Sequence, residues 1–73
     1  MLRIPTQSSL FKSYGYNKDR LSFEIEFIDE TIVSYYEVPF EKYDLWQSQE
    51  TDKKRIDFFK AEIQAKHQGI RTR

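Results

Sequence analysis

Residues 21–39, LSFEIEFIDETIVSYYEVP, contain two alternating runs on either side of a short acidic turn. Apolar residues occupy every second position of the first run, from Leu21 to Phe27, with serine and glutamate between them. This period of two is typical of a β-strand that has one face buried and the other in water. The stretch therefore predicts an antiparallel hairpin that turns at Asp29 and Glu30.

A two-residue turn at this place fixes the register of the hairpin. The predicted pairs are Phe27 with Ile32, Ile25 with Ser34, Phe23 with Tyr36, and Leu21 with Val38. This register gathers the apolar residues of both strands on one face and turns Tyr35 to the other. We therefore expect Tyr35 to be exposed beside the glutamates of the first run.

The N-terminal residues extend this hairpin into a meander. Residues 10–16, LFKSYGY, predict a first strand, in which a bulge near Gly15 changes the inward face and turns Phe11 into the core. Residues 17–20, NKDR, are turn residues. Residues 1–9 predict an extended lead-in around a proline.

The C-terminal half predicts two helices. Pro39 suits the first position of a short helix, in which Phe40, Tyr43 and Trp46 follow at three-residue spacing. Thr51 suits the N-cap of a longer helix that ends before Gly69. The spacing of Ile56, Phe59 and Ile63 gives this second helix one apolar stripe, and Phe58 is expected to pack under the first helix.

These elements predict one α+β domain over residues 1–73. The expected architecture is a three-stranded antiparallel β-meander, followed by a short helix and a longer C-terminal helix packed on one sheet face. A chain of 73 residues has little room for the concave pocket that catalysis requires. With no cysteine and one histidine, His67, the sequence predicts no enzyme, no catalytic residue, no metal site and no cofactor.

The sequence contains no run long enough to span a membrane and no signal-peptide core, so we expect a cytoplasmic protein. Its charge is unevenly distributed: five Lys and Arg face nine Asp and Glu in residues 1–50, against seven and three in residues 51–73. A basic C-terminal segment is one mark of a surface for polyanions. The candidate phosphate-binding residues are Lys53, Lys54, Arg55, Lys60, Lys66, Arg71 and Arg73, with Tyr35 as a group that stacks on a base.

A second hypothesis is a protein-interaction module that acts on a host or phage protein. Its candidate contacts are the acidic hairpin residues Glu24, Glu26, Asp29 and Glu30, together with an exposed Trp46. The free edge of the sheet also offers a route to a homodimer.

Several of these segments occur in an order that resembles the KTSC domain, a short module named for its place at the C-terminus of some lysyl-tRNA synthetases. The resemblance covers residues 4–66 and consists of paired serines, then SYGYN, LSFEIEF, IVSYYEVP and DFFKAEI. It implies a small stand-alone domain of bacterial or phage origin whose partner is RNA, including tRNA. A tyrosine-x-tyrosine of the family falls on residues 33–35, where Val33 replaces the first aromatic residue.

Overall fold

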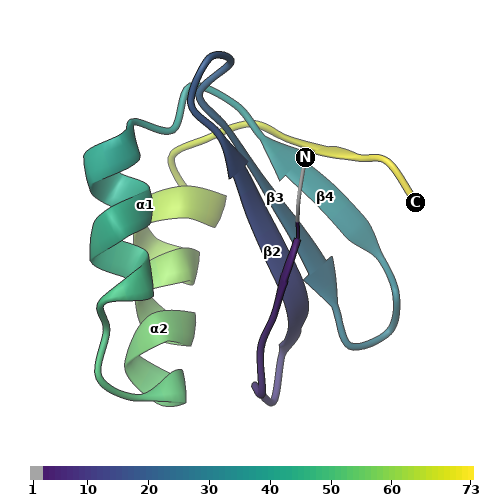
Figure 1. Ribbon diagram of the computed structural model, residues 1–73, viewed down its shortest axis with the longest axis vertical. Helices are drawn as coiled ribbons and strands as arrows, with labels where there is room; N and C mark the ends of the chain where they lie inside the picture. Colours follow the sequence, from purple (N-terminus) through teal and green to yellow (C-terminus); the bar gives the residue numbers. More distant parts are fainter. Residues whose placement is uncertain (1–2) are drawn as a thin grey trace.

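The computed structural model describes residues 3–73, so the first two residues of the expected lead-in lie outside the described part. The elements follow one another as β1 (Ile4–Pro5), β2 (Phe11–Asn17), β3 (Ser22–Phe27), β4 (Ile32–Tyr35), α1 (Phe40–Gln47), α2 (Asp52–Phe58), η1 (Phe59–Gln64) and β5 (Gly69–Arg71). The α+β class predicted from the sequence is confirmed, with helices on one side of a sheet (Figure 1).

The sheet has five antiparallel strands in the order β1-β2-β3-β4-β5, rather than the three that were expected. The expected meander is its centre, β2-β3-β4. The two additional strands are short and lie at the edges: β1 pairs Ile4 with Tyr14, and β5 pairs Ile70 with Ser34. Strands of two or three residues are too short to show an alternating pattern, which is why the sequence did not reveal them.

The register predicted for the central hairpin is wrong by one residue. In the structure Phe23 pairs with Tyr35 and Ile25 with Val33. The turn contains three residues instead of two, because the amide of Glu30 bonds to the carbonyl of Phe27 at 2.9 Å and Glu30 then takes a φ of 70°. A type I turn followed by a left-handed residue is the usual three-residue hairpin loop.

A bulge in β2 turns Phe11 into the core, as expected, but it does not lie at Gly15. The register shifts between Phe11 and Ser13, so that Lys12 is the additional residue. Phe11 is completely buried and contacts Phe59 edge-to-face, with ring centroids 5.2 Å apart.

The core between sheet and helices is mostly aromatic. Its buried residues are Phe11, Tyr14, Phe23, Ile25, Tyr35, Val38, Tyr43, Trp46, Phe59 and Ile63. Many of the rings meet at steep angles, for example those of Tyr14 and Trp46 at 78° with centroids 4.8 Å apart. Edge-to-face contacts of this kind stabilise a small core beyond simple burial of area.

Both predicted helices are present, and the predicted N-cap of the second is confirmed. Thr51 is the N-cap of α2 and accepts a hydrogen bond from the amide of Lys54 at 3.1 Å. The helix continues as a π-helical turn, η1, which carries Phe59 and Ile63 into the core, and Phe58 packs against the core from a partly buried position. Pro39 is the N-cap of α1, whereas it was predicted to be the first helical residue, so the helix begins one residue later than expected. No helix within residues 3–73 is long and apolar enough to cross a membrane.

Candidate functional site

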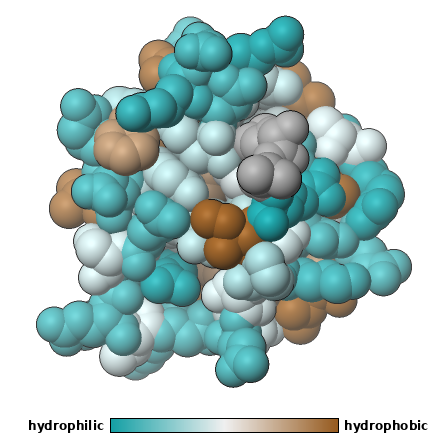
Figure 2. Space-filling model, in the orientation of Figure 1, coloured by the Kyte–Doolittle hydropathy of each residue, from teal (hydrophilic) through white to brown (hydrophobic). Residues whose placement is uncertain are grey.

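The face of the sheet that the helices leave open carries small polar side chains. Ser13, Ser22 and Ser34 point to this side from three neighbouring strands, and each is at most 7% exposed. The side of the molecule that Figure 2 shows is mostly hydrophilic, with separate apolar residues between the polar ones. Longer polar side chains therefore stand over a floor of serines.

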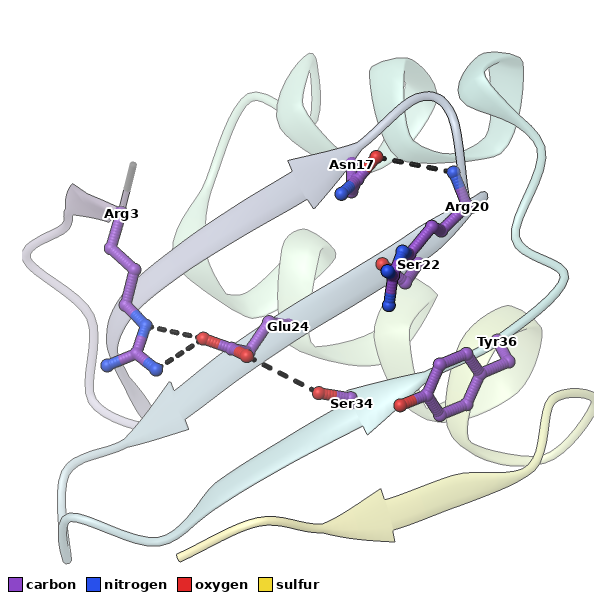
Figure 3. A pocket seen from close by; sticks show the side chains of 7 residues that line it. All are labelled: Arg3, Asn17, Arg20, Ser22, Glu24, Ser34 and Tyr36. Atoms are coloured by element: carbon purple, nitrogen blue, oxygen red, sulfur yellow. Dashed lines mark hydrogen bonds and ion pairs between the residues drawn. The ribbon is translucent and has the colours of Figure 1, made fainter. Parts of the chain in front are cut away.

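A groove of about 440 Å³ lies on this face. It is lined by Arg3, Asn17, Arg20, Ser22, Glu24, Ser34 and Tyr36, with the helices behind the sheet (Figure 3). We call this set the sheet groove. Its members come from β2, β3, the turn between them, the end of β4 and the N-terminal segment, so it exists only when the meander is paired.

Glu24 lies in the middle of the sheet groove and is fixed by Arg3. The guanidinium donates from Nε to Oε1 of Glu24 at 2.6 Å, and a second guanidinium nitrogen contacts the same oxygen. The other oxygen, Oε2, accepts a long 3.4 Å hydrogen bond from the hydroxyl of Ser34. The Glu24 carboxylate is therefore neutralised and held in one orientation.

Arg20 is placed on the rim of the groove by a turn. The side-chain oxygen of Asn17 accepts hydrogen bonds from the amides of Asp19 at 3.0 Å and Arg20 at 3.2 Å. Asn17 is suited to this role because its side chain mimics a backbone turn. Within residues 3–73, no carboxylate forms an ion pair with Arg20, so its charge is open to a ligand.

Tyr36 forms the other rim and is 39% exposed. Its backbone is held by the segment before β5, since its amide donates to the carbonyl of Gln68 at 3.3 Å and its carbonyl lies 3.1 Å from Nδ1 of His67. The Nε2 atom of His67 is 2.9 Å from the ammonium of Lys42. These contacts hold the backbone from which the partly exposed ring projects.

A second carboxylate on this side, Glu26, is only 8% exposed and was wrongly expected to be solvated. It accepts a hydrogen bond from Ser13 at 2.9 Å and pairs with Arg73 at 2.7 Å. The hydrogen bond from Ser13 is the largest cause that lowers the pKa of Glu26, and the charges of Lys12 and Arg73 act in the same direction against the effect of burial. The charges of Glu24 and Glu26 on this face are therefore both compensated by arginines.

Two aromatic residues that were expected to be exposed, Tyr35 and Trp46, are buried. Tyr35 is 4% exposed and packs edge-to-face against Phe59 with centroids 5.4 Å apart, so it cannot stack on a base. Trp46 is completely buried and cannot contact a partner protein. The one-residue register shift explains the first error, because it exchanges the faces of Tyr35 and Tyr36.

The predicted basic residues do not form one surface of free charges. Arg55 stacks on Trp46, with the guanidinium carbon 5.2 Å from the ring centroid, and donates to the carbonyl of Gln47 at 2.9 Å. Acidic neighbours pair with three others, in the contacts Lys54–Glu50, Lys66–Glu62 and Arg73–Glu26. Lys53 and Lys60 are exposed on the second helix, and Arg71 is exposed on β5.

The acidic hairpin residues have local roles. Asp29 accepts a hydrogen bond from the amide of Thr31 at 2.9 Å, and Glu30 pairs with Lys12 at 3.3 Å. Both acids are exposed. They therefore stabilise the turn and leave only a small part of the expected acidic surface.

Sequence reasoning missed most of the sheet groove: Arg3, Asn17, Arg20, Ser22, Ser34 and Tyr36. One signal was present, since serines recur at outward positions in each of the three central strands. A floor of small polar residues in a sheet leaves space above it that larger side chains would fill. Tyr36 could have been found only with the correct register.

The structure thus defines a small α+β domain with two helices on one face of an antiparallel meander and a polar groove on the other. The chain belongs to the KTSC family, because the KTSC domain profile matches residues 7–67. The fold is similar to the crystal structure of a KTSC domain protein from Yersinia pestis, with a TM-score of 0.86, 26% sequence identity, and coverage of 99% of this chain and 97% of that one. No curated protein matches the sequence.

Proposed function

We propose that this protein is a small, non-enzymatic module that binds single-stranded RNA in the sheet groove. The observation that carries the proposal is the exposed ring of Tyr36 across the serine floor from the guanidinium of Arg20, with which no carboxylate of residues 3–73 forms an ion pair. Proteins that bind single-stranded nucleic acid combine an aromatic ring for the base with nearby cations for the backbone. Tyr36 takes the first role and Arg20 the second.

The electrostatics of the groove support an anionic ligand. Arg3 neutralises Glu24, the one carboxylate in the groove lining, and Arg20 adds a further positive charge. The net charge of the groove is therefore positive even though a glutamate lies at its centre. Base stacking contributes about 1–3 kcal/mol per base, so the loss of one stacked base changes the affinity by a factor that can be measured.

The basic residues of the second helix have a smaller role in the proposed RNA binding than the sequence suggested. The helix covers the opposite face of the sheet, so Lys53 and Lys60 cannot contact the nucleotides that occupy the groove (Figure 1). They would attract RNA only as a separate, weaker surface. Binding in the groove and binding on the helix therefore predict different effects of mutation.

Fewer of the predicted residues support the alternative, a module that binds a host or phage protein. Trp46 is buried, and Glu24 and Glu26 are occupied by arginines. Asp29 and Glu30 at the tip of the hairpin are the exposed acids that this alternative retains. We therefore place RNA binding first.

The test is fluorescence anisotropy with a labelled single-stranded RNA of mixed sequence at 50 and 200 mM salt. We expect Arg20→Glu to weaken binding and to reduce the salt dependence, because each phosphate contact contributes a slope of about −0.7 in log K against log salt for single strands. The matched control is the double variant Lys53→Glu/Lys60→Glu, which changes more charge on the helix side. A larger loss in this control than in Arg20→Glu would contradict the groove, and no binding of the wild type at 50 mM salt would contradict RNA binding.

A further inference from the structure

The sheet groove contains a feature that phosphate binding alone does not need: a carboxylate at its centre. The side chain of Glu24 is 17% exposed and is placed between Arg3 and Ser34 (Figure 3). An ionised carboxylate only accepts hydrogen bonds. Its position therefore indicates that the ligand presents donor groups to this part of the groove.

The two carboxylate oxygens of Glu24 differ in the hydrogen bonds that they accept. Oε1 is occupied by the guanidinium of Arg3. Among the contacts of residues 3–73, Oε2 has only that of 3.4 Å from Ser34, which is at the long limit for a hydrogen bond between two oxygens. Oε2 is therefore an acceptor with unused capacity, fixed in place by the Arg3 pair.

We infer that Glu24 reads the base and selects guanine, an inference that rests on the proposed binding of single-stranded RNA. Guanine presents two adjacent donors, N1–H and the N2 amino group, on its Watson–Crick edge. Both donors converge on Oε2 in this arrangement, because Oε1 is occupied by Arg3 and a carboxylate oxygen has two lone pairs. Adenine and cytosine place an acceptor beside their amino group, and uracil has one donor between two acceptors. An acceptor held against a carboxylate remains without a hydrogen bond, which costs free energy.

The position of Tyr36 makes this contact geometrically consistent. Its ring extends back over the sheet, with the hydroxyl directed toward Ser34, and Glu24 lies beyond Ser34 on the next strand (Figure 3). A base that stacks on Tyr36 therefore turns one edge toward Glu24. Bases in single strands are recognised by this combination of stacking and contacts to the Watson–Crick edge.

The experiment compares three labelled hexanucleotides with the wild-type protein: UUGGUU, UUUUUU, and UUIIUU, in which inosine lacks the N2 amino group. A base contact with two hydrogen bonds discriminates by about tenfold or more. We expect the guanine hexamer to bind about tenfold more tightly than the uridine hexamer, with the inosine hexamer between them. The matched variant Glu24→Gln, checked for folding by circular dichroism, is expected to bind all three with similar affinity.

The outcomes separate this inference from the function on which it rests. Equal binding of all three hexamers by the wild type would overturn guanine selection and leave RNA binding in place. A guanine preference that persists in Glu24→Gln would overturn the role of Glu24. Absence of binding for every hexamer would overturn both proposals. The comparison of the guanine and inosine hexamers needs no variant, so it tests guanine selection even if Glu24→Gln does not fold.

Discussion

Ser8 and Asp52, which are 44 residues apart in the sequence, join the N-terminal segment to the second helix. The hydroxyl of Ser8 donates to Oδ1 of Asp52 at 2.5 Å and accepts from the amides of Leu10 at 3.1 Å and Phe11 at 3.2 Å. The adjacent Ser9 donates to Oδ2 from its amide at 3.0 Å and from its hydroxyl at 2.9 Å. The paired serines thus form a structural clasp with Asp52 at the start of α2.

This clasp predicts an acid-sensitive contribution to stability. The hydrogen bond from Ser8 is the largest cause that lowers the pKa of Asp52 in the folded state, followed by the amide of Ser9. Because the folded pKa is below the unfolded value of about 3.9, the contribution is complete at neutral pH and is lost as the pH falls through the folded pKa. Urea unfolding between pH 7 and 2 should therefore show a steeper loss for the wild type than for Asp52→Asn.

The variant also has an expected effect at neutral pH. Asp52→Asn should lower the free energy of unfolding by about 1–3 kcal/mol, because charge-assisted hydrogen bonds become neutral ones. The control is Asp57→Asn, an exposed acid on the same helix. Equal effects of the two variants at pH 7 would show that general helix charge, rather than the clasp, is responsible.

Tyr35, the last residue of β4, and Tyr36, which follows it, provide a test of the groove together with its control. Tyr36→Ala should weaken RNA binding by about tenfold, the value of one stacked base, and should leave stability nearly unchanged because the ring is on the surface. Tyr35→Phe keeps the ring that packs on Phe59 and should leave RNA affinity unchanged. Anisotropy and urea unfolding of both variants check this, and an unchanged RNA affinity for a folded Tyr36→Ala would contradict stacking on Tyr36.

Gly69 predicts a steric requirement at the edge strand. It pairs with Tyr35, and a Cβ atom at this position would lie 2.7 Å from Cε1 of Tyr35 and 2.9 Å from Cγ1 of Val33. We expect Gly69→Ala to lower the free energy of unfolding by roughly 1–3 kcal/mol, the range for overpacking. Gln68→Ala, at the exposed preceding position, is the control, and an unchanged urea midpoint for Gly69→Ala would show that the strand moves away without cost.

Tyr43 predicts an alkaline limit to stability. Burial, with smaller contributions from Tyr14 and Asp44, raises its pKa to about 12. The folded state therefore keeps the phenolic proton at a pH where the unfolded chain, with a pKa of about 10, loses it. This contribution is complete below pH 10 and is lost as the pH rises through 12. Urea unfolding from pH 8 to 11.5 should show a smaller loss in Tyr43→Phe, and identical slopes would contradict it.

The local signals in the sequence were sufficient for the helices and much of the core. The capping chemistry of Thr51 and the stripe of Ile56, Phe59 and Ile63 depend on residues close in the chain, so they could be read directly. The bulge was expected in the right strand but at the wrong residue. Its effect on Phe11 was still predicted because burying that ring dominates the choice of face.

The groove could not be predicted because it depends on long-range pairing. Arg3 lies beside Glu24 because the short strand β1 pairs with the sheet. Arg20 is positioned by a turn, and residue propensities do not specify the geometry of that turn. The apolar pattern of residues 32–38 was also ambiguous. The chain bends at Glu37, which has a φ of 59°, so Val38 returns to the core although Tyr36 faces outward.

The turn that sets the true register supplies the last prediction. Glu30 has a φ of 70°, a left-handed conformation that glycine adopts without the steric cost of a Cβ atom. Its ion pair with Lys12 is exposed and contributes little. Glu30→Gly should therefore raise the free energy of unfolding by about 0.5–1 kcal/mol and leave the register intact. Urea unfolding measures the gain, and Asp29→Gly is the control, since Asp29 does not have a positive φ and should lose stability. A loss in both variants would mean that the turn residues stabilise the hairpin through their side chains rather than through backbone conformation.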